Sequence, residues 1–155
     1  MYSLGRYKYW RDEMFKWHWL PYWQAHEGMR QATAAFYRAR KKDPYEGWPF
    51  IALLPTLSRA PFIAARCDRH MAALQTIEAV RMYAAGHDGK LPAKLADIIA
   101  APVPIDPITG KDFIYQIDGN TFTLDAPAPS GMSASFANVF KVTLNNQPLT
   151  RKGPS

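Results

Sequence analysis

The strongest pattern in the chain is a helical spacing of apolar side chains between residues 58 and 85. Large apolar residues recur there at every third or fourth position, and charged residues fall between them. A single apolar stripe at this spacing is typical of a helix that packs one face against the rest of a domain. We therefore predict a long helix over 58–85 whose buried face, including the cysteine thiol, consists of Ile63, Cys67, Met71, Leu74, Ile77 and Val80.

A period of two replaces the helical spacing after residue 112 and predicts a small antiparallel sheet. Apolar side chains alternate over 113–117 and again over 121–124, and the Asp-Gly-Asn sequence between them favours a tight turn. Residues 140–144 alternate in the same way and predict a third strand. Because a lone hairpin is only marginally stable in water, we expect this strand and a covering helix to complete the fold.

Glycine and proline residues set the predicted boundaries of these elements. Gly86 or Gly89 is expected to end the long helix in the left-handed conformation, and Pro92 to begin a second, short helix that reaches residue 100. Pro61 is compatible with the long helix because it falls in the first turn, where no intrahelical donor is needed. Residues 43–49, with two prolines and a glycine, predict a loop.

The first 42 residues carry about half of the aromatic side chains, interleaved with lysine and arginine. They predict a helix over about 4–41 that is broken at Pro21. The predicted fold class is therefore α+β, with a long helix packed on a small three-stranded antiparallel sheet and an additional N-terminal aromatic-rich helical arm. The predicted segments are the arm at 1–42, a helix-plus-hairpin domain at 50–145 and a flexible tail at 146–155.

Composition and charge narrow the classes of function only slightly. The chain has 155 residues, of which 48% are hydrophobic and 21% charged, as expected of a folded domain. The net charge of +6 favours acidic partners, although the basic run at 38–42 is explained as a helix C-terminus. No apolar run approaches the ~18 residues of a membrane span, and the N-terminus is too charged and aromatic for a secretory signal.

Few residues suggest catalysis. His26 and Glu27 begin a zinc-protease motif, but Arg30 stands where the second histidine is required, which excludes that motif. A metal-dependent hydrolase that uses His18, His26 and Glu27 is kept as an alternative, although the two histidines, eight residues apart, could share a helix face only if Pro21 did not interrupt it. We predict no catalytic residue, no metal site and no cofactor, and glycine-rich phosphate-binding motifs are absent.

The aromatic arm carries the strongest functional signal. A mixture of tryptophan, tyrosine, lysine and arginine can form a core, pack against a protein partner, lie at a lipid interface or stack on bases. We expect most of these rings to cover the long helix and form core. Among binding roles, a protein partner is our main hypothesis, because aromatic and arginine side chains dominate the energetics of protein interfaces. An anionic membrane surface is the second hypothesis and nucleic acid the least favoured. The residues predicted to contact the partner are Trp10, Arg11, Lys16, Trp17, Trp19 and Trp23.

Two stretches carry a resemblance to a known family, namely MAALQTIEAVRMYAAGHDGKLP at 71–92 and DPITGKDFIYQIDGNTFTL at 106–124. Their order, an alanine-rich helix, a GKLP turn, a DP-x-TG loop and a small sheet, resembles bacterial type IV pilins and type II secretion pseudopilins over residues 51–125. It is also similar to uncharacterised bacterial families in which a helix-plus-hairpin unit ends a longer envelope protein. The preceding apolar text, GWPFIALLP, lacks the glutamate and the length of a pilin helix.

The resemblance implies a structural role without enzymatic activity, in assembly or interaction with protein subunits of the cell envelope or periplasm. Some proteins similar to pseudopilins bind calcium in this region, which draws attention to Asp106, Asp118 and Asp125. Calcium needs roughly six to eight oxygen ligands, so we predict turn-forming aspartates instead. We expect His70, in the long helix, to be a boundary or core residue, and His87, in the turn after it, to cap the helix end.

Overall fold

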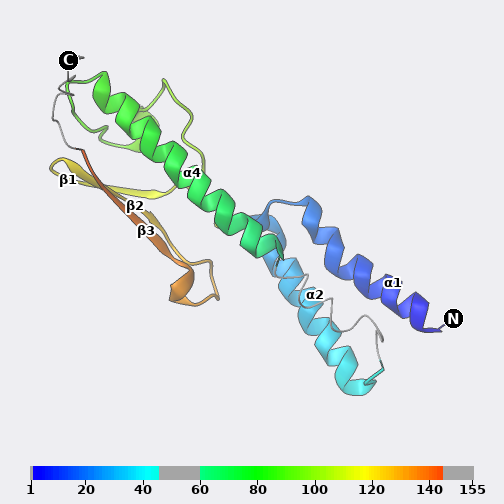
Figure 1. Ribbon diagram of the computed structural model, residues 1–155. Coiled ribbons are helices and arrows are strands. Elements are labelled where there is room, and N and C mark those ends of the chain that lie inside the picture. Colours follow the sequence, from blue (N-terminus) through cyan, green and yellow to red (C-terminus); the bar gives the residue numbers. More distant parts are fainter. Residues whose placement is uncertain (1, 46–59, 145–155) are drawn as a thin grey trace, which may run out of the picture. The chain divides into compact units, whose positions relative to one another are not determined.

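The structure is a computed structural model that describes residues 2–45 and 60–144. In chain order its main elements are the helices α1 (Tyr2–Phe15), α2 (Tyr22–Lys42) and α4 (Ala60–Ala85) and the strands β1 (Ile114–Asp118), β2 (Thr121–Ala126) and β3 (Asn138–Thr143). Short 3-10 turns lie at Lys16–Trp19 (η1), Leu95–Asp97 (η3) and Ala134–Phe136 (η4). The predicted α+β class is confirmed (Figure 1). The predicted tail at 146–155 and residues 50–59 of the predicted second domain lie outside the described residues.

The chain forms two compact units, and their boundary differs from the predicted segments. Of the described residues, the first unit contains those up to His70 together with Pro107–Lys111, and the second contains Met71–Asp106 and those from Asp112 to Leu144. Helix α4 therefore contributes residues 60–70 to the first unit and 71–85 to the second. The start of α4 belongs to the same unit as α2, and the ring centroids of Tyr22 and Phe62 lie 5.4 Å apart between them.

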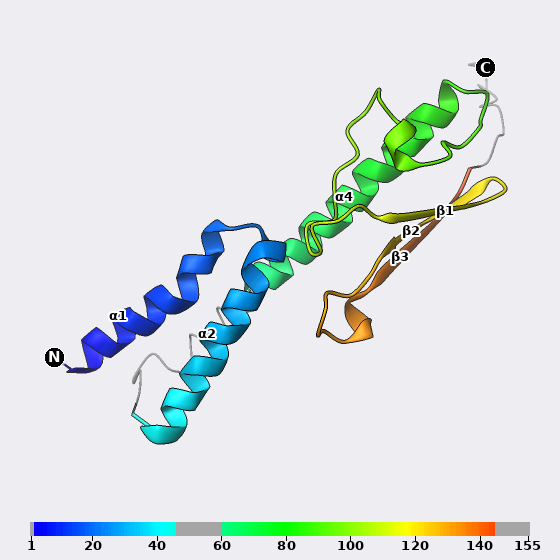
Figure 2. The same cartoon turned by 180° about the vertical axis from the view of Figure 1, so that it is seen from behind.

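In the first unit, α1 and α2 lie side by side as a helical hairpin, which both overall views show (Figures 1 and 2). Trp10 and Met14 of α1 pack against Ala32 and Phe36 of α2 in a buried cluster. The rings of Trp10 and Phe36 meet edge-on, with centroids 5.2 Å apart. The cluster accounts for part of the aromatic content of the arm, because these rings hold its two helices together.

In the second unit, the three strands form one antiparallel sheet in the order β1-β2-β3. Ile117 pairs with Phe122 and Tyr115 with Leu124, which confirms the predicted hairpin. A two-residue turn with Gly119 at φ 57° joins the strands, and glycine adopts this left-handed conformation without steric cost. The predicted third strand is also confirmed and begins at residue 138, two residues earlier than its first alternating aromatic.

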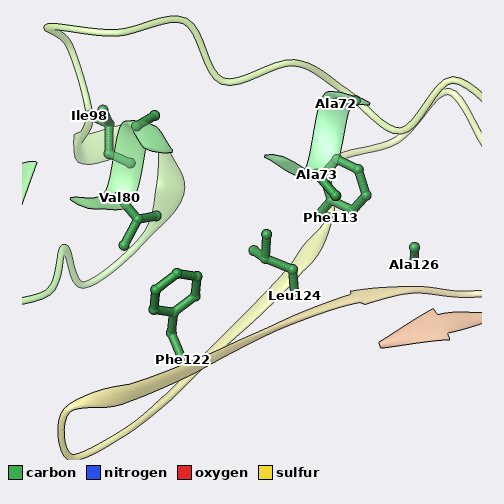
Figure 3. Packing of buried hydrophobic residues seen from close by; sticks show 9 residues of the cluster. Ala72, Ala73, Val80, Ile98, Phe113, Phe122, Leu124 and Ala126 are labelled. Atoms are coloured by element: carbon green, nitrogen blue, oxygen red, sulfur yellow. The ribbon is translucent and has the colours of Figure 1, made fainter. Parts of the chain in front are cut away.

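The core of the second unit lies between the inner face of this sheet and α4 (Figure 3). Phe113, Phe122 and Leu124 point from the sheet region toward the helix, which presents mainly small side chains to them. The buried helix residues of the cluster are Ala72, Ala73, Ala79 and Val80. Small side chains allow the helix backbone to approach the sheet closely.

The predicted buried face of α4 is wrong over most of its length. Ile63, Met71 and Leu74 are exposed, Leu74 by 54%, and Cys67 is exposed as well. Of the predicted stripe, Val80 is fully buried and Ile77 is partly buried against the core. The helix instead buries its alanine-rich face. The positions of the largest apolar residues therefore did not predict which face of α4 is buried.

The end of α4 agrees with the prediction, whereas the helix predicted to follow it is much shorter than expected. Gly89 has φ 79° and its N–H donates to the Ala84 carbonyl at 2.8 Å, as in a Schellman ending. Asp88 also has a positive φ of 53°, whereas Gly86 does not. The helix predicted from Pro92 to residue 100 reduces to η3, because the backbone becomes extended at Ile98, whose side chain enters the core.

Candidate protein-interaction site

The break between α1 and α2 places most of the predicted contact residues at one corner of the first unit. The turn η1 follows α1 directly, and Pro21 precedes the first residue of α2. Proline suits this position because its φ, here −52°, is fixed. It also has no backbone N–H group that would need a hydrogen-bond acceptor. Its carbonyl accepts hydrogen bonds from the N–H groups of Gln24 and Ala25, at 2.9 and 3.1 Å. We call residues 16–23 the aromatic corner.

Trp19 is the least covered aromatic side chain of the aromatic corner. It is 91% exposed, and the neighbouring Leu20 and Trp23 are 45% and 37% exposed. A tryptophan that becomes fully covered buries roughly 150–250 Å² of surface. The aromatic corner therefore offers a large apolar group that the described fold leaves in water.

The other two tryptophans of the aromatic corner contact glycines. The Trp17 ring lies against Gly28 of α2 so closely that a Cβ at that position would be 2.5 Å from it. The Trp23 ring lies equally close to Gly110, whose φ of 68° also requires glycine. The indole nitrogen of Trp17 is buried and has no hydrogen-bond partner among the described residues. Trp17 and Trp23 thus support the first unit and hold the aromatic corner in place.

The remaining predicted contact residues differ in how much surface they offer. Trp10 is 5% exposed and belongs to the α1–α2 core, so it presents almost no surface to a partner. Arg11 pairs with Asp12 at 2.7 Å, and Lys16 pairs with Glu13 at 2.9 Å. The Lys16 ammonium also lies 5.2 Å from the centre of the Trp17 ring. Both exposed cations remain at the surface and, of the two, Lys16 belongs to the aromatic corner.

A cavity of about 230 Å³ opens beside the aromatic corner, within the first unit. One wall comes from residues 17–29, where Tyr22, Ala25 and Met29 share one face of α2, and the other from residues 61–68 of α4. Tyr22 also meets Phe62 of α4, with ring centroids 5.4 Å apart, and its burial raises the pKa of the phenol. The lining residues are Trp17, His18, Leu20, Pro21, Tyr22, Ala25, Met29, Pro61, Ala64, Ala65 and Asp68.

The prediction missed the α4 wall of this cavity. Pro61, Ala64, Ala65 and Asp68 follow a helical spacing, which the sequence shows, but small residues in such a row gave no reason to assign a site. Asp68 is exposed and makes no hydrogen bond or ion pair with any described residue. Among the described residues, it is therefore an acidic group without an ion-pair partner.

The alternative metal-site residues are engaged in separate local contacts. His18 stacks on Phe15 at 4.8 Å, and the Nδ1 of His26 lies 3.3 Å from the Trp23 carbonyl oxygen. Glu27 accepts hydrogen bonds from Arg30 and Gln31, and these bonds hold its pKa at about 2. Within residues 2–45 and 60–144, no three His, Cys, Asp or Glu side chains come close enough together to hold a metal ion. Glu27 is thus part of a surface ion pair.

The three aspartates around the hairpin lie in different environments. Asp118 directly precedes the hairpin turn and Asp106 directly precedes a turn at residues 107–109, as predicted, whereas Asp125 is within β2 opposite Ile114. Asp106 is fully buried, which the sequence pattern did not indicate.

The predictions for the two histidines of the α4 region have different outcomes. The Nδ1–H of His87 donates to the Tyr83 carbonyl at 2.7 Å and its ring stacks on Tyr83, as predicted for a group at a helix end. His70 is exposed, so its predicted place at the boundary of the core or within it is wrong.

None of the helices in the described part of the chain combines the length and hydropathy that a membrane crossing requires. In comparisons with known proteins, no family model, no curated protein and no solved structure matches this chain.

Proposed function

We propose that this protein is a non-enzymatic interaction module that binds a protein subunit through its aromatic corner. The exposure of Trp19 carries the proposal. Covering about 200 Å² of tryptophan surface contributes on the order of 5 kcal/mol to an association. Tryptophan is also among the residues most enriched at the energetic centres of interfaces.

The rigidity of the aromatic corner supports the same role. Trp17 and Trp23, on either side of Trp19, are fixed against glycines, so a partner need not order the backbone around the exposed ring. Preorganisation of this kind lowers the entropic cost of association. The cationic Lys16 at the edge gives the aromatic corner the composition of an interface, with an apolar centre and a charged rim.

The setting of this interaction is proposed from the motifs in residues 71–92 and 106–124. They are similar to those of pilin-like proteins, whose members assemble with other subunits of the bacterial cell envelope. We therefore propose an envelope or periplasmic location and a role in assembly, as in pseudopilins.

The proposal is tested by site-specific photo-cross-linking in cells that express the protein. A photoreactive phenylalanine analogue replaces Trp19 in one variant and the exposed Lys141 of β3 in a control variant. We expect one protein adduct that forms at position 19 and not at position 141. The adduct protein is then purified and titrated against the wild-type chain and Trp19→Ala, which should weaken binding at least tenfold.

Two outcomes would overturn the proposal. The first is identical adducts from both positions, or equal affinities of the wild-type and Trp19→Ala chains for the adduct protein. The second is salt-sensitive binding to vesicles with anionic lipid that is lost in Trp19→Ala, because the same ring would then serve a membrane surface.

A further inference from the structure

We propose that the cavity beside Trp17 receives one lysine or arginine side chain of the protein partner, with the cationic end at Asp68. The inference rests on the proposed function, because it assigns a residue type of the partner to the surface next to Trp19. It goes further in naming the chemistry that the cavity selects.

The size of the cavity limits its occupant to a single side chain. A cavity of about 150 Å³ in a protein core accommodates a benzene molecule, whereas pockets for drug-sized ligands begin at about 300 Å³. The volume here, about 230 Å³, lies between these values. It is therefore too small for a nucleotide cofactor and large enough for a long side chain.

The walls of the cavity match an aliphatic stem followed by a cation. Leu20, Pro21 and Met29 provide apolar surface, and the Trp17 and Tyr22 rings are also in the lining. Lysine and arginine bury their methylene groups against such surface while their charge stays at a polar position. Aromatic rings add attraction for a cation through their quadrupole.

Charge decides between a cationic occupant and a neutral or anionic one. Asp68 is the one carboxylate of the lining, and it has no partner among the described residues. Two other acids of the same unit, Glu13 and Glu27, are already paired, with Lys16 and Arg30. A neutral occupant would displace water from Asp68 without replacing its hydrogen bonds, which is unfavourable. An ammonium or guanidinium group supplies those bonds in their stronger, charge-assisted form.

The test uses the purified full chain and small probes, monitored by NMR at the tryptophan indole signals. The probes are n-butylammonium and n-butylguanidinium, with neutral 1-pentanol as the uncharged analogue. We expect saturable shifts of the Trp17 signal with both cations, at least threefold weaker binding of pentanol, and a loss of about threefold to tenfold in cation affinity in Asp68→Asn. Asp118→Asn, which removes an exposed carboxylate in the second unit, serves as the matched control and should change nothing.

A second variant keeps the test decisive if Asp68→Asn alters the fold. Ala64→Leu adds a larger side chain at an exposed position of the cavity wall and should block cations and pentanol alike while the circular dichroism spectrum stays unchanged. The proposal is overturned if pentanol binds as tightly as the cations, if Asp68→Asn binds them equally well, or if no saturable shift occurs at Trp17. None of these measurements needs the partner, so their failure is distinct from a failure of the cross-linking at Trp19.

Discussion

At the scale of single residues, Tyr115 has a buried hydroxyl group without a hydrogen-bond partner among the described residues. Its ring lies on the inner face of the sheet, opposite Leu124 and 5.8 Å from the ring of Phe122. Burial raises the pKa of this phenol to about 12, because the phenolate would lose its hydration.

Replacement of Tyr115 by phenylalanine tests this description. At pH 7 we expect the free energy of unfolding to stay equal or to rise by up to about 1 kcal/mol, because an unpaired buried hydroxyl is removed. Between about pH 10 and pH 12, the unfolded phenol ionises while the folded one remains neutral, so the wild-type chain loses stability as the pH rises. Tyr115→Phe should lack this part of the loss.

Urea denaturation of both chains at pH 8 and pH 11 measures the difference. Equal losses of stability in the two chains over this range would show that the Tyr115 hydroxyl titrates as it does in water.

At the scale of helices, α1 and α2 each contain a glycine, and the two glycines have opposite surroundings. Gly5 in α1 has open space where a Cβ would be, whereas Gly28 in α2 lies against the Trp17 ring. Alanine is the better helix former by about 1 kcal/mol at an unobstructed position. At Gly28 this gain is opposed by a clash with a large, rigid ring.

We therefore expect Gly5→Ala and Gly28→Ala to change stability in opposite directions. Gly5→Ala should raise the free energy of unfolding by up to about 1 kcal/mol, and Gly28→Ala should lower it by about 1–3 kcal/mol. Thermal and urea denaturation of the full chain measure both changes. If Gly28→Ala were stabilising, the contact between Trp17 and α2 would have to be looser than described.

Helix α4 shows which features of an element the sequence can predict. Its existence, its start near Pro61 and its left-handed end at Gly89 follow from local rules of backbone geometry. Its buried face does not, because hydrophobic periodicity gives weight to large side chains such as Leu74, and the contact is made by alanines such as Ala73. The hairpin was predictable because alternation and a glycine turn specify the same register.

At the scale of the whole molecule, the buried hydrophobic residues of the two described ranges, 2–45 and 60–144, include two separate clusters. One cluster joins α1 and α2 around Phe36, and the other joins the sheet and the second part of α4 around Phe122. The clusters have no residue in common and belong to different units. Regions with separate cores can open separately, at free energies below that of global unfolding.

Hydrogen exchange of two core variants checks this separation. Phe36→Ala should accelerate amide exchange in α1 and α2 while the strands keep their protection, and Phe122→Ala should have the reverse effect. Each change removes a fully buried ring and should cost about 3–5 kcal/mol within its own cluster. Acceleration of both regions by either substitution would mean that the chain unfolds as one cooperative body.

The candidate site was only partly predictable at this scale. Sequence reasoning identified Trp17, Trp19 and Trp23 by composition, but the same argument also selected Trp10, which the α1–α2 cluster buries. Asp68 was missed because it lies far along the chain from the aromatic corner, and only tertiary structure brings the two walls of the cavity together.

The exposure of Cys67 has a practical consequence for all of these experiments. It is the one cysteine of the 155 residues, its thiol is reachable on α4, and it directly precedes Asp68. A maleimide dye can therefore be attached at a single known atom without any prior substitution. Its fluorescence emission would report on binding at the cavity that Asp68 lines. Because the thiol is accessible, we expect unlabelled samples kept in air without a reductant to form disulfide-linked dimers.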